Sequence, residues 1–213
     1  MNPAGMSESR QRRSLIAFYF GGAVARDPNL DTDDAVILVS KRAYRDVNRT
    51  IHGMGSLKDA DELRDEIHQS IVDFVERLEE VTDQGEFDWR HRDWCLGAMA
   101  TFSNYPHRDR ERFGLTYGQA QKWLNMTLKY LSVLGHTGVS SIYPYLHAPL
   151  DRVVYRQARK VWGLAAPAGA WSKLGEKEYC EYQQALRVAA RKDFDSVMDW
   201  EAELWVDGVG VTS

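Results

Sequence analysis

The sequence predicts an all-α protein, folded as a single helical domain with room for two lobes around a cleft. Apolar residues recur every three or four positions along most of the chain, which is the spacing of one helix face. Residues that cap helices precede several of these stretches, and glycines follow them. We find no stretch with the strict apolar–polar alternation of a half-buried strand. With 213 residues, the chain is long enough to bury a sizeable core.

Residues 1–13 are polar and predict a flexible N-terminus ahead of a helical domain over 14–213. The apolar run that follows, LIAFYFGGAVA, predicts a buried first element. Arginines before this run and an Ala-Val-Ala triplet at its end also fit a signal peptide. The run is short, however, and the chain has only two cysteines, which favours a reducing compartment. We therefore expect a buried element in a cytoplasmic protein.

Two amphipathic helices come next. Asp31-Thr32 can cap the first, and Gly53 with Gly55 ends it. The second, over about 57–83, has the clearest pattern in the chain. Its apolar stripe consists of Leu57, Leu63, Ile67, Ile71, Phe74, Leu78 and Val81. Similar reasoning predicts further helices over about 87–102, 117–134, 151–162, 175–191 and 194–206.

Charge is distributed unevenly along the chain. Residues 57–88 hold 12 Asp/Glu against 3 Lys/Arg, a local charge of −9, so the rest of the chain carries +5 within a total of −4. An acidic face and a basic face fit this division, and nucleic-acid binding requires only the basic one.

No segment reaches the roughly 18–20 apolar residues of a membrane span. His91 and Cys95 are too few ligands for a zinc site, so we expect neither metal nor cofactor.

Lys122 and Asp151 are the residues best placed for chemistry. Each lies near the start of a predicted helix, and the connector GHTGVSSIYPY between those helices is long enough to bring the two starts together. A lysine becomes nucleophilic when it loses its proton, which an apolar setting and a helix N-terminus both favour. A carboxylate at a helix N-terminus stays ionised. Taken singly, an exposed lysine and a simple helix cap explain these residues equally well.

Basic residues surround this pair. Arg152, Arg156 and Arg159 recur at spacings of four and three on one face of the predicted helix, a pattern that can follow a line of phosphates. The loop before the 117–134 helix carries further arginines, at 108, 110 and 112. A solvated basic face is the alternative explanation for these positions.

The region about 113–162 resembles the helix-hairpin-helix DNA glycosylases, and among them the archaeal 8-oxoguanine glycosylases. Gln121-Lys122, followed by apolar residues and by Lys129, is similar to the catalytic lysine segment of that branch. About thirty residues later, Pro149-Leu150-Asp151-Arg152-Val153 is similar to its catalytic aspartate segment. The hairpin before the lysine is degenerate, since Leu115-Thr116-Tyr117-Gly118-Gln119-Ala120 has one glycine where the family has two.

The resemblance implies an enzyme that flips a modified base out of double-stranded DNA and excises it, with oxidised guanine as one candidate base. Asp151 would stabilise the positive charge that develops on the sugar, and Lys122 would attack C1′ and form a Schiff base that permits strand cleavage. Gly118 and Gln121, at the hairpin, would contact DNA, with backbone N–H groups at Gly118 holding a phosphate. We expect a monomer. Five tryptophans could stack on the flipped base, although core packing is the simpler role for each: Trp89, Trp94, Trp123, Trp162 and Trp171.

Two other functions remain open. Arg45 and His52, with six residues between them on a predicted helix, match the loose Arg–His spacing of helical ribonucleases of the HEPN type. RNA cleavage that is lost in His52→Ala but kept in Lys122→Gln would support that alternative. A non-catalytic helical adaptor is the other, with the acidic helix over 57–83 as its partner surface. For an adaptor, changes at Lys122 or Asp151 would be without effect.

Overall fold

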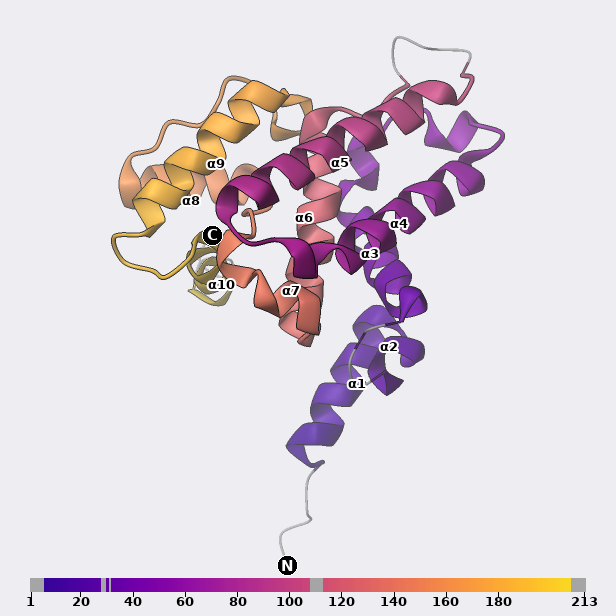
Figure 1. The fold of residues 1–213 in the computed structure, drawn as a ribbon, viewed down its shortest axis with the longest axis horizontal. Coiled ribbons are helices and arrows are strands. Elements are labelled where there is room, and N and C mark those ends of the chain that lie inside the picture. The colour runs from indigo at the N-terminus through magenta and orange to yellow at the C-terminus, as the bar shows by residue number, and fades with distance from the viewer. Residues whose placement is uncertain (1–5, 28–29, 31, 108–112, 208–213) are drawn as a thin grey trace, which may run out of the picture.

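The computed structural model describes residues 6–27, 30, 32–107 and 113–207 of the chain (Figure 1). These residues form short 3-10 turns and ten α-helices and contain no strand, which confirms the all-α fold class. None of these helices is long and apolar enough to cross a membrane. The helices are α1 Glu8–Phe20, α2 Gly22–Arg26, α3 Asp33–Val47, α4 Ala60–Glu76, α5 Gln84–Asn104, α6 Tyr117–Leu134, α7 Thr137–Ser141, α8 Arg152–Trp162, α9 Glu176–Ala190 and α10 Val197–Asp207.

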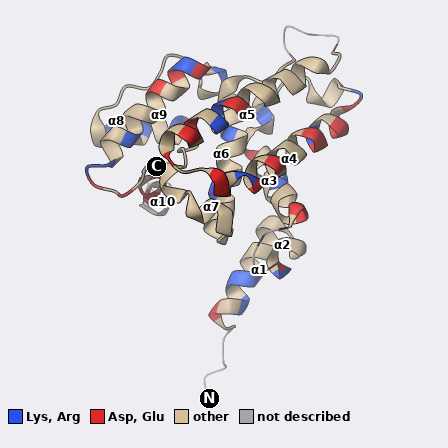
Figure 2. Ribbon diagram, viewed as in Figure 1, with Lys and Arg blue, Asp and Glu red and all other residues tan. Residues whose placement is uncertain are grey.

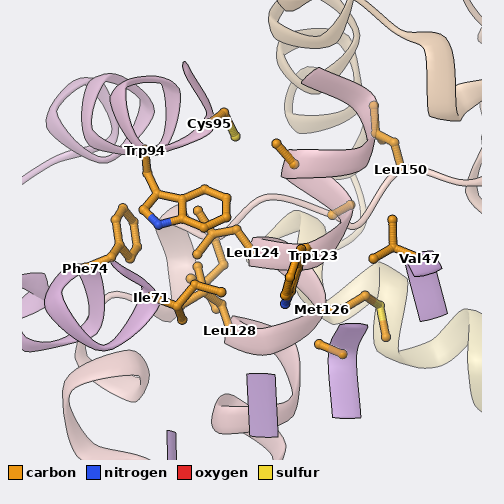
Figure 3. Packing of buried hydrophobic residues seen from close by; sticks show 14 of the residues in the cluster. Val47, Ile71, Phe74, Trp94, Cys95, Trp123, Leu124, Met126, Leu128 and Leu150 are labelled. Atoms are coloured by element: carbon orange, nitrogen blue, oxygen red, sulfur yellow. The ribbon is translucent and has the colours of Figure 1, made fainter. Parts of the chain in front are cut away.

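Helix α6 is the central element of the fold. Every residue from Tyr117 to Leu128 is buried, because α3, α5, α9 and the 3-10 turn Trp171–Lys173 pack against the helix. Figure 3 shows Trp94 of α5 and Ile71 of α4 beside Leu124 and Leu128 of α6. One continuous hydrophobic cluster includes residues from α2 through α10. The chain is therefore a single packed domain, and any cleft is a feature of its surface.

Side-chain caps mark the starts of several helices, although α4 and α5 each begin three residues from the predicted start. The Thr32 side chain caps α3 by accepting a hydrogen bond from the Ala35 amide, and the Asp83 side chain caps α5 in the same way. Helix α4 ends at Glu76, earlier than its apolar stripe predicts. A 3-10 turn over Leu78–Glu80 follows, and Leu78 and Val81 still reach the core from this tighter backbone. Helix α7, within the connector, is not predicted from the sequence.

The N-terminal region differs from the prediction. Helix α1 begins at Glu8, inside the stretch expected to be loose, and residues 1–5 lie outside the described part of the chain. The expectation of a buried first element is wrong, because no residue of α1 is buried and Leu15 and Phe18 are 68% and 87% exposed. The reason is geometric: α1 projects away from the body of the molecule and touches it mainly through its C-terminal end (Figure 1).

Acidic side chains follow α4 and the first turns of α5, as the local charge over 57–88 predicts (Figure 2). Arg90 of α5 pairs with two of these carboxylates, those of Glu80 and Glu86, at 2.9 and 2.8 Å. Most of the others are exposed on α4. They form a solvated acidic surface.

His68 of α4 makes the stability of this domain depend on pH. Its Nδ1 atom lies 2.7 Å from Ser40 Oγ, which also accepts a hydrogen bond from the Trp123 indole at 3.1 Å. Burial lowers the pKa of His68 to about 4, so the folded protein binds fewer protons than the unfolded chain between about pH 4 and the ordinary histidine value of about 6.5. Stability therefore falls as the pH drops through that window, by about 2 kcal/mol for this group at pH 5.

Urea unfolding at pH 7.5 and at pH 5 measures this effect. We expect His68→Gln to reduce the loss of stability between the two pH values by about 2 kcal/mol. The same change at His52, which is exposed, serves as the control and should leave the loss as it is in the parent protein. An identical pH dependence in His68→Gln and the parent would contradict the assignment.

Candidate functional site

Lys122 and Asp151 meet in the folded chain. Lys122 Nζ lies 2.8 Å from Asp151 Oδ2 and 3.3 Å from the Pro149 carbonyl oxygen. Lys122 is only 5% exposed, and the side chain of Asp151 is 17% exposed. A shielded lysine amine therefore touches a carboxylate that remains open on one side.

The position of Asp151 follows from its role as the N-cap of α8. Its Oδ1 atom accepts hydrogen bonds from the Val153 and Val154 amides at 2.8 and 3.0 Å. The Oδ2 atom is then left to face Lys122. The cap uses Oδ1 and the ion pair uses Oδ2, so both oxygens of the Asp151 carboxylate have partners. The N-terminus of a helix also favours a negatively charged side chain at this position.

Gln121 has a structural role in the interior. It is fully buried, so the expectation that it contacts DNA is wrong. Its amide group donates to the Leu150 carbonyl oxygen and accepts from the Leu150 amide, both at 3.3 Å. These two bonds tie α6 to the residue before Asp151. Gln121 is therefore a positioning residue, and its neighbour Lys122 is the one that faces the site.

A buried hydrogen-bond network extends from Gln121 across the domain. Asn125 donates to Gln121 and to the Tyr179 hydroxyl, at 3.0 and 2.9 Å. Tyr179 lies 2.7 Å from His147 Nδ1, and His147 Nε2 lies 2.7 Å from Asp88. Two hydrogen bonds from Arg187 hold the Asp88 carboxylate, whose pKa is lowered by its bonds to His147 and Arg187 against the opposing effect of burial. Satisfied networks of this kind specify one packing arrangement.

The Lys122–Asp151 pair opens into a cavity of about 950 Å³. Helix α6 contributes Lys122, Met126 and Tyr130 to its lining. The N-terminal part of α8 and the segment 169–171 form another part of the wall, with α10 contributing Trp205. A cavity of this size can hold a nucleotide, and it combines aromatic rings with charged groups as ligand sites do.

Sequence reasoning missed the arginines that α3 and the 3-10 turn Asn48–Thr50 after it add to this cavity. Arg42, Arg45 and Arg49 line it together with Arg152. Including Lys122, the lining has five cationic side chains against the carboxylates of Asp46 and Asp151, a net charge of +3 in a chain of net charge −4. The spacing of 42, 45 and 49 was the available signal, since positions three and four apart share one face of a predicted helix.

The expectation that backbone N–H groups around Gly118 hold a DNA phosphate fails for the Gly118 amide itself, which is bonded within the protein. Its N–H donates to the Leu174 carbonyl oxygen at 3.0 Å. A Cβ atom at this position would lie 2.0 Å from the Trp171 carbonyl oxygen. The start of α6 is closed further by a capping box between Thr116 and Gln119. Glycine is required here because the 171–174 turn packs directly on the helix.

The remaining predicted residues have distinct environments. Arg152, Arg156 and Arg159 are exposed on α8, and only Arg152 lines the cavity. Among the tryptophan candidates, Trp123 and Trp94 belong to the core, whereas Trp171 lines the cavity. Trp205, which was not a candidate, lines it too. The basic loop at 108–112 lies outside the described residues.

Arg45 and His52 do not share a helix. Helix α3 ends at Val47, a 3-10 turn follows, and the exposed His52 lies beyond it. Arg45 lines the cavity and His52 does not. The helical placement on which the ribonuclease alternative depends is therefore wrong.

Lys129, the second lysine of the resembled segment, stabilises the cavity wall. Its Nζ atom pairs with Glu201 of α10 at 2.7 Å, and burial lowers the pKa of Lys129 while Glu201 opposes that shift. The same carboxylate oxygen accepts a hydrogen bond from the Trp205 indole at 2.7 Å. The pair thus attaches α10 to α6 and sets where Trp205 lies.

Among the described residues, no group of three or more histidine, cysteine or acidic side chains could hold a metal ion.

The arrangement suits chemistry at a single electrophilic carbon. An amine and a carboxylate share one opening, cations surround it, and aromatic rings are available for a flat group. The chain matches no protein-family model, no curated protein and no solved structure. Its function must be inferred from these residues.

Proposed function

We propose that this protein is a DNA glycosylase that excises a modified base from double-stranded DNA, with an accompanying Schiff-base lyase activity. The observation that carries this proposal is the 2.8 Å contact between Lys122 and Asp151 at the floor of a cationic cavity. Oxidised guanine is the first candidate base, because the two segments resemble those of the archaeal 8-oxoguanine glycosylases.

The chemistry assigns one role to each member of the pair. As the glycosidic bond breaks, its electron pair leaves with the base and positive charge develops on the sugar, which the Asp151 carboxylate stabilises. Once the base has left, Lys122 passes a proton to Asp151 Oδ2, its nearest acceptor, and the freed amine bonds to C1′, which neutralises the charge on the sugar. Opening of the sugar gives a Schiff base, and loss of a proton from C2′ then expels the 3′ phosphate.

The surroundings of the pair support a nucleic-acid substrate. A flipped nucleotide brings a phosphodiester and a flat base to the enzyme. The net positive charge of the cavity suits the phosphodiester. Aromatic rings such as those of Tyr155, Trp171 and Trp205 can stack on the base. An adaptor protein has no need of a buried lysine–carboxylate pair opening into such a cavity.

Borohydride trapping tests the proposal. The protein is incubated with duplex oligonucleotides that each carry one modified base, in the presence of borohydride, which reduces a Schiff base to a stable covalent adduct. We expect an adduct with at least one duplex and none with Lys122→Gln. Base release that survives Lys122→Gln but is lost in Asp151→Asn would indicate a glycosylase without lyase activity. Absence of base release from every modified duplex would reject the proposal.

The exposed arginines of α8 provide a separate prediction. We expect Arg156→Glu/Arg159→Glu to weaken binding to duplex DNA. The slope of log affinity against log salt, which is negative, should become less steep by about 2, since each lost phosphate contact removes about 0.9. Fluorescence anisotropy between 50 and 200 mM salt measures the slope. A slope equal to that of the parent protein would show that this face is only solvated.

A further inference from the structure

The cavity contains an arginine pair that neither the sequence resemblance nor the Lys122–Asp151 chemistry explains. Arg45 belongs to α3, and Arg49 belongs to the 3-10 turn Asn48–Thr50 that directly follows it. Both arginines line the cavity and both are exposed. Helix α3 packs extensively against α6, and the pair lies at the same opening as Lys122.

Counter-charges distinguish this pair from its neighbour Arg42. Arg42 donates to Asp46 at 2.9 Å and lies over the Tyr19 ring at 4.1 Å, so its positive charge is compensated by groups of the protein itself. Within the described part of the chain, no carboxylate lies within ion-pair distance of Arg45 or Arg49. Two uncompensated guanidinium groups beside a cavity of net positive charge favour an anionic ligand.

We infer that Arg45 and Arg49 bind backbone phosphates of the strand whose flipped nucleotide lies at Lys122–Asp151. This inference rests on the proposed function and adds the groups that hold the strand. It moves phosphate binding away from the start of α6, where the Gly118 amide is already bonded to Leu174, to the wall formed by the C-terminal end of α3 and the 3-10 turn after it. Guanidinium groups suit this role because they offer paired N–H donors to phosphate oxygens.

The geometry also separates Arg45 and Arg49 from the arginines of α8. The α8 arginines recur along an outer face, and only Arg152 among them reaches the cavity. Arg45 and Arg49 both lie at the cavity itself. Phosphates near the flipped nucleotide therefore bind Arg45 and Arg49, and those farther along the duplex bind α8.

Binding to a duplex with a central tetrahydrofuran abasic analogue tests the inference without requiring base excision. We expect Arg45→Gln/Arg49→Gln to weaken binding by about tenfold at 150 mM salt. The slope of log affinity against log salt should become less steep by about 2, for two lost phosphate contacts. The matched control is Arg191→Gln/Lys192→Gln, which removes two exposed cations outside the cavity. A nucleoside monophosphate serves as competitor, to distinguish a free nucleotide from a strand.

The outcomes separate this inference from the proposed function. Unchanged affinity and salt slope in Arg45→Gln/Arg49→Gln would overturn the inference, even if the parent protein forms the borohydride adduct. Loss of affinity equal to that of the control would overturn it as well, as would displacement of the duplex by micromolar mononucleotide. Weaker binding and a less steep salt dependence in Arg45→Gln/Arg49→Gln, but not in the control, would support it, even if no base is released.

Discussion

Replacing Asp151 by asparagine should lower the rate of base release by about 100- to 1,000-fold, the usual loss when one group that stabilises transition-state charge is removed. The change replaces a carboxylate by a neutral amide beside the developing positive charge. The fold should persist, because asparagine caps helices about as well as aspartate, and the Oδ1 atom of the amide can still accept the Val153 and Val154 amides. Single-turnover excision from a modified duplex measures the rate.

The same substitution at Asp83 is the matched control. Asp83 caps α5 through a 2.9 Å bond to the Glu86 amide and does not line the cavity. Asp83→Asn should leave both base release and stability close to those of the parent protein. If Asp151→Asn and Asp83→Asn release the base equally fast, Asp151 is only a helix cap.

Replacing Gly118 by alanine should destabilise the protein by an amount at or above the upper end of the about 1–3 kcal/mol typical of overpacking. The added Cβ would lie 2.0 Å from the Trp171 carbonyl oxygen, which is backbone and cannot rotate away. The 171–174 turn must move, and with it Trp171 in the cavity wall. Urea unfolding gives the change in stability, and binding to the abasic-analogue duplex reports on the cavity.

Gly97 supplies a control of opposite sign. It lies on the exposed side of α5, and a Cβ there meets nothing within 4 Å. Gly97→Ala should therefore stabilise the protein by about 0.5–1 kcal/mol, because alanine loses less conformational freedom in a helix. Equal effects at Gly118 and Gly97 would contradict the close packing of the 171–174 turn on α6.

Local sequence signals predicted most of the helices. The capping residues Thr32 and Asp151 mark helix starts correctly, because a cap depends on groups within three residues. The 117–134 and 151–162 helices are close to α6 and α8 for the same reason. The prediction failed for α1, since an apolar run does not reveal whether another element will cover it.

The sequence predicted some residues of the candidate site and misassigned others. Lys122 and Asp151 were found because each belongs to a short, readable segment, and the fold joins them at 2.8 Å. Gln121 and Gly118 were assigned to DNA by their position in the same segments. The structure instead uses both for packing, through bonds to Leu150 and Leu174.

The sequence by itself determined the all-α class, the main helices and the two residues of the Lys122–Asp151 pair. Only the tertiary structure decided which residues surround that pair. Arg45 and Arg49 lie more than seventy positions before Lys122, and Trp205 lies more than fifty positions after Asp151. Helix periodicity and capping depend on neighbours within a turn or two, whereas a cavity is formed by packing between distant elements, which no local pattern records.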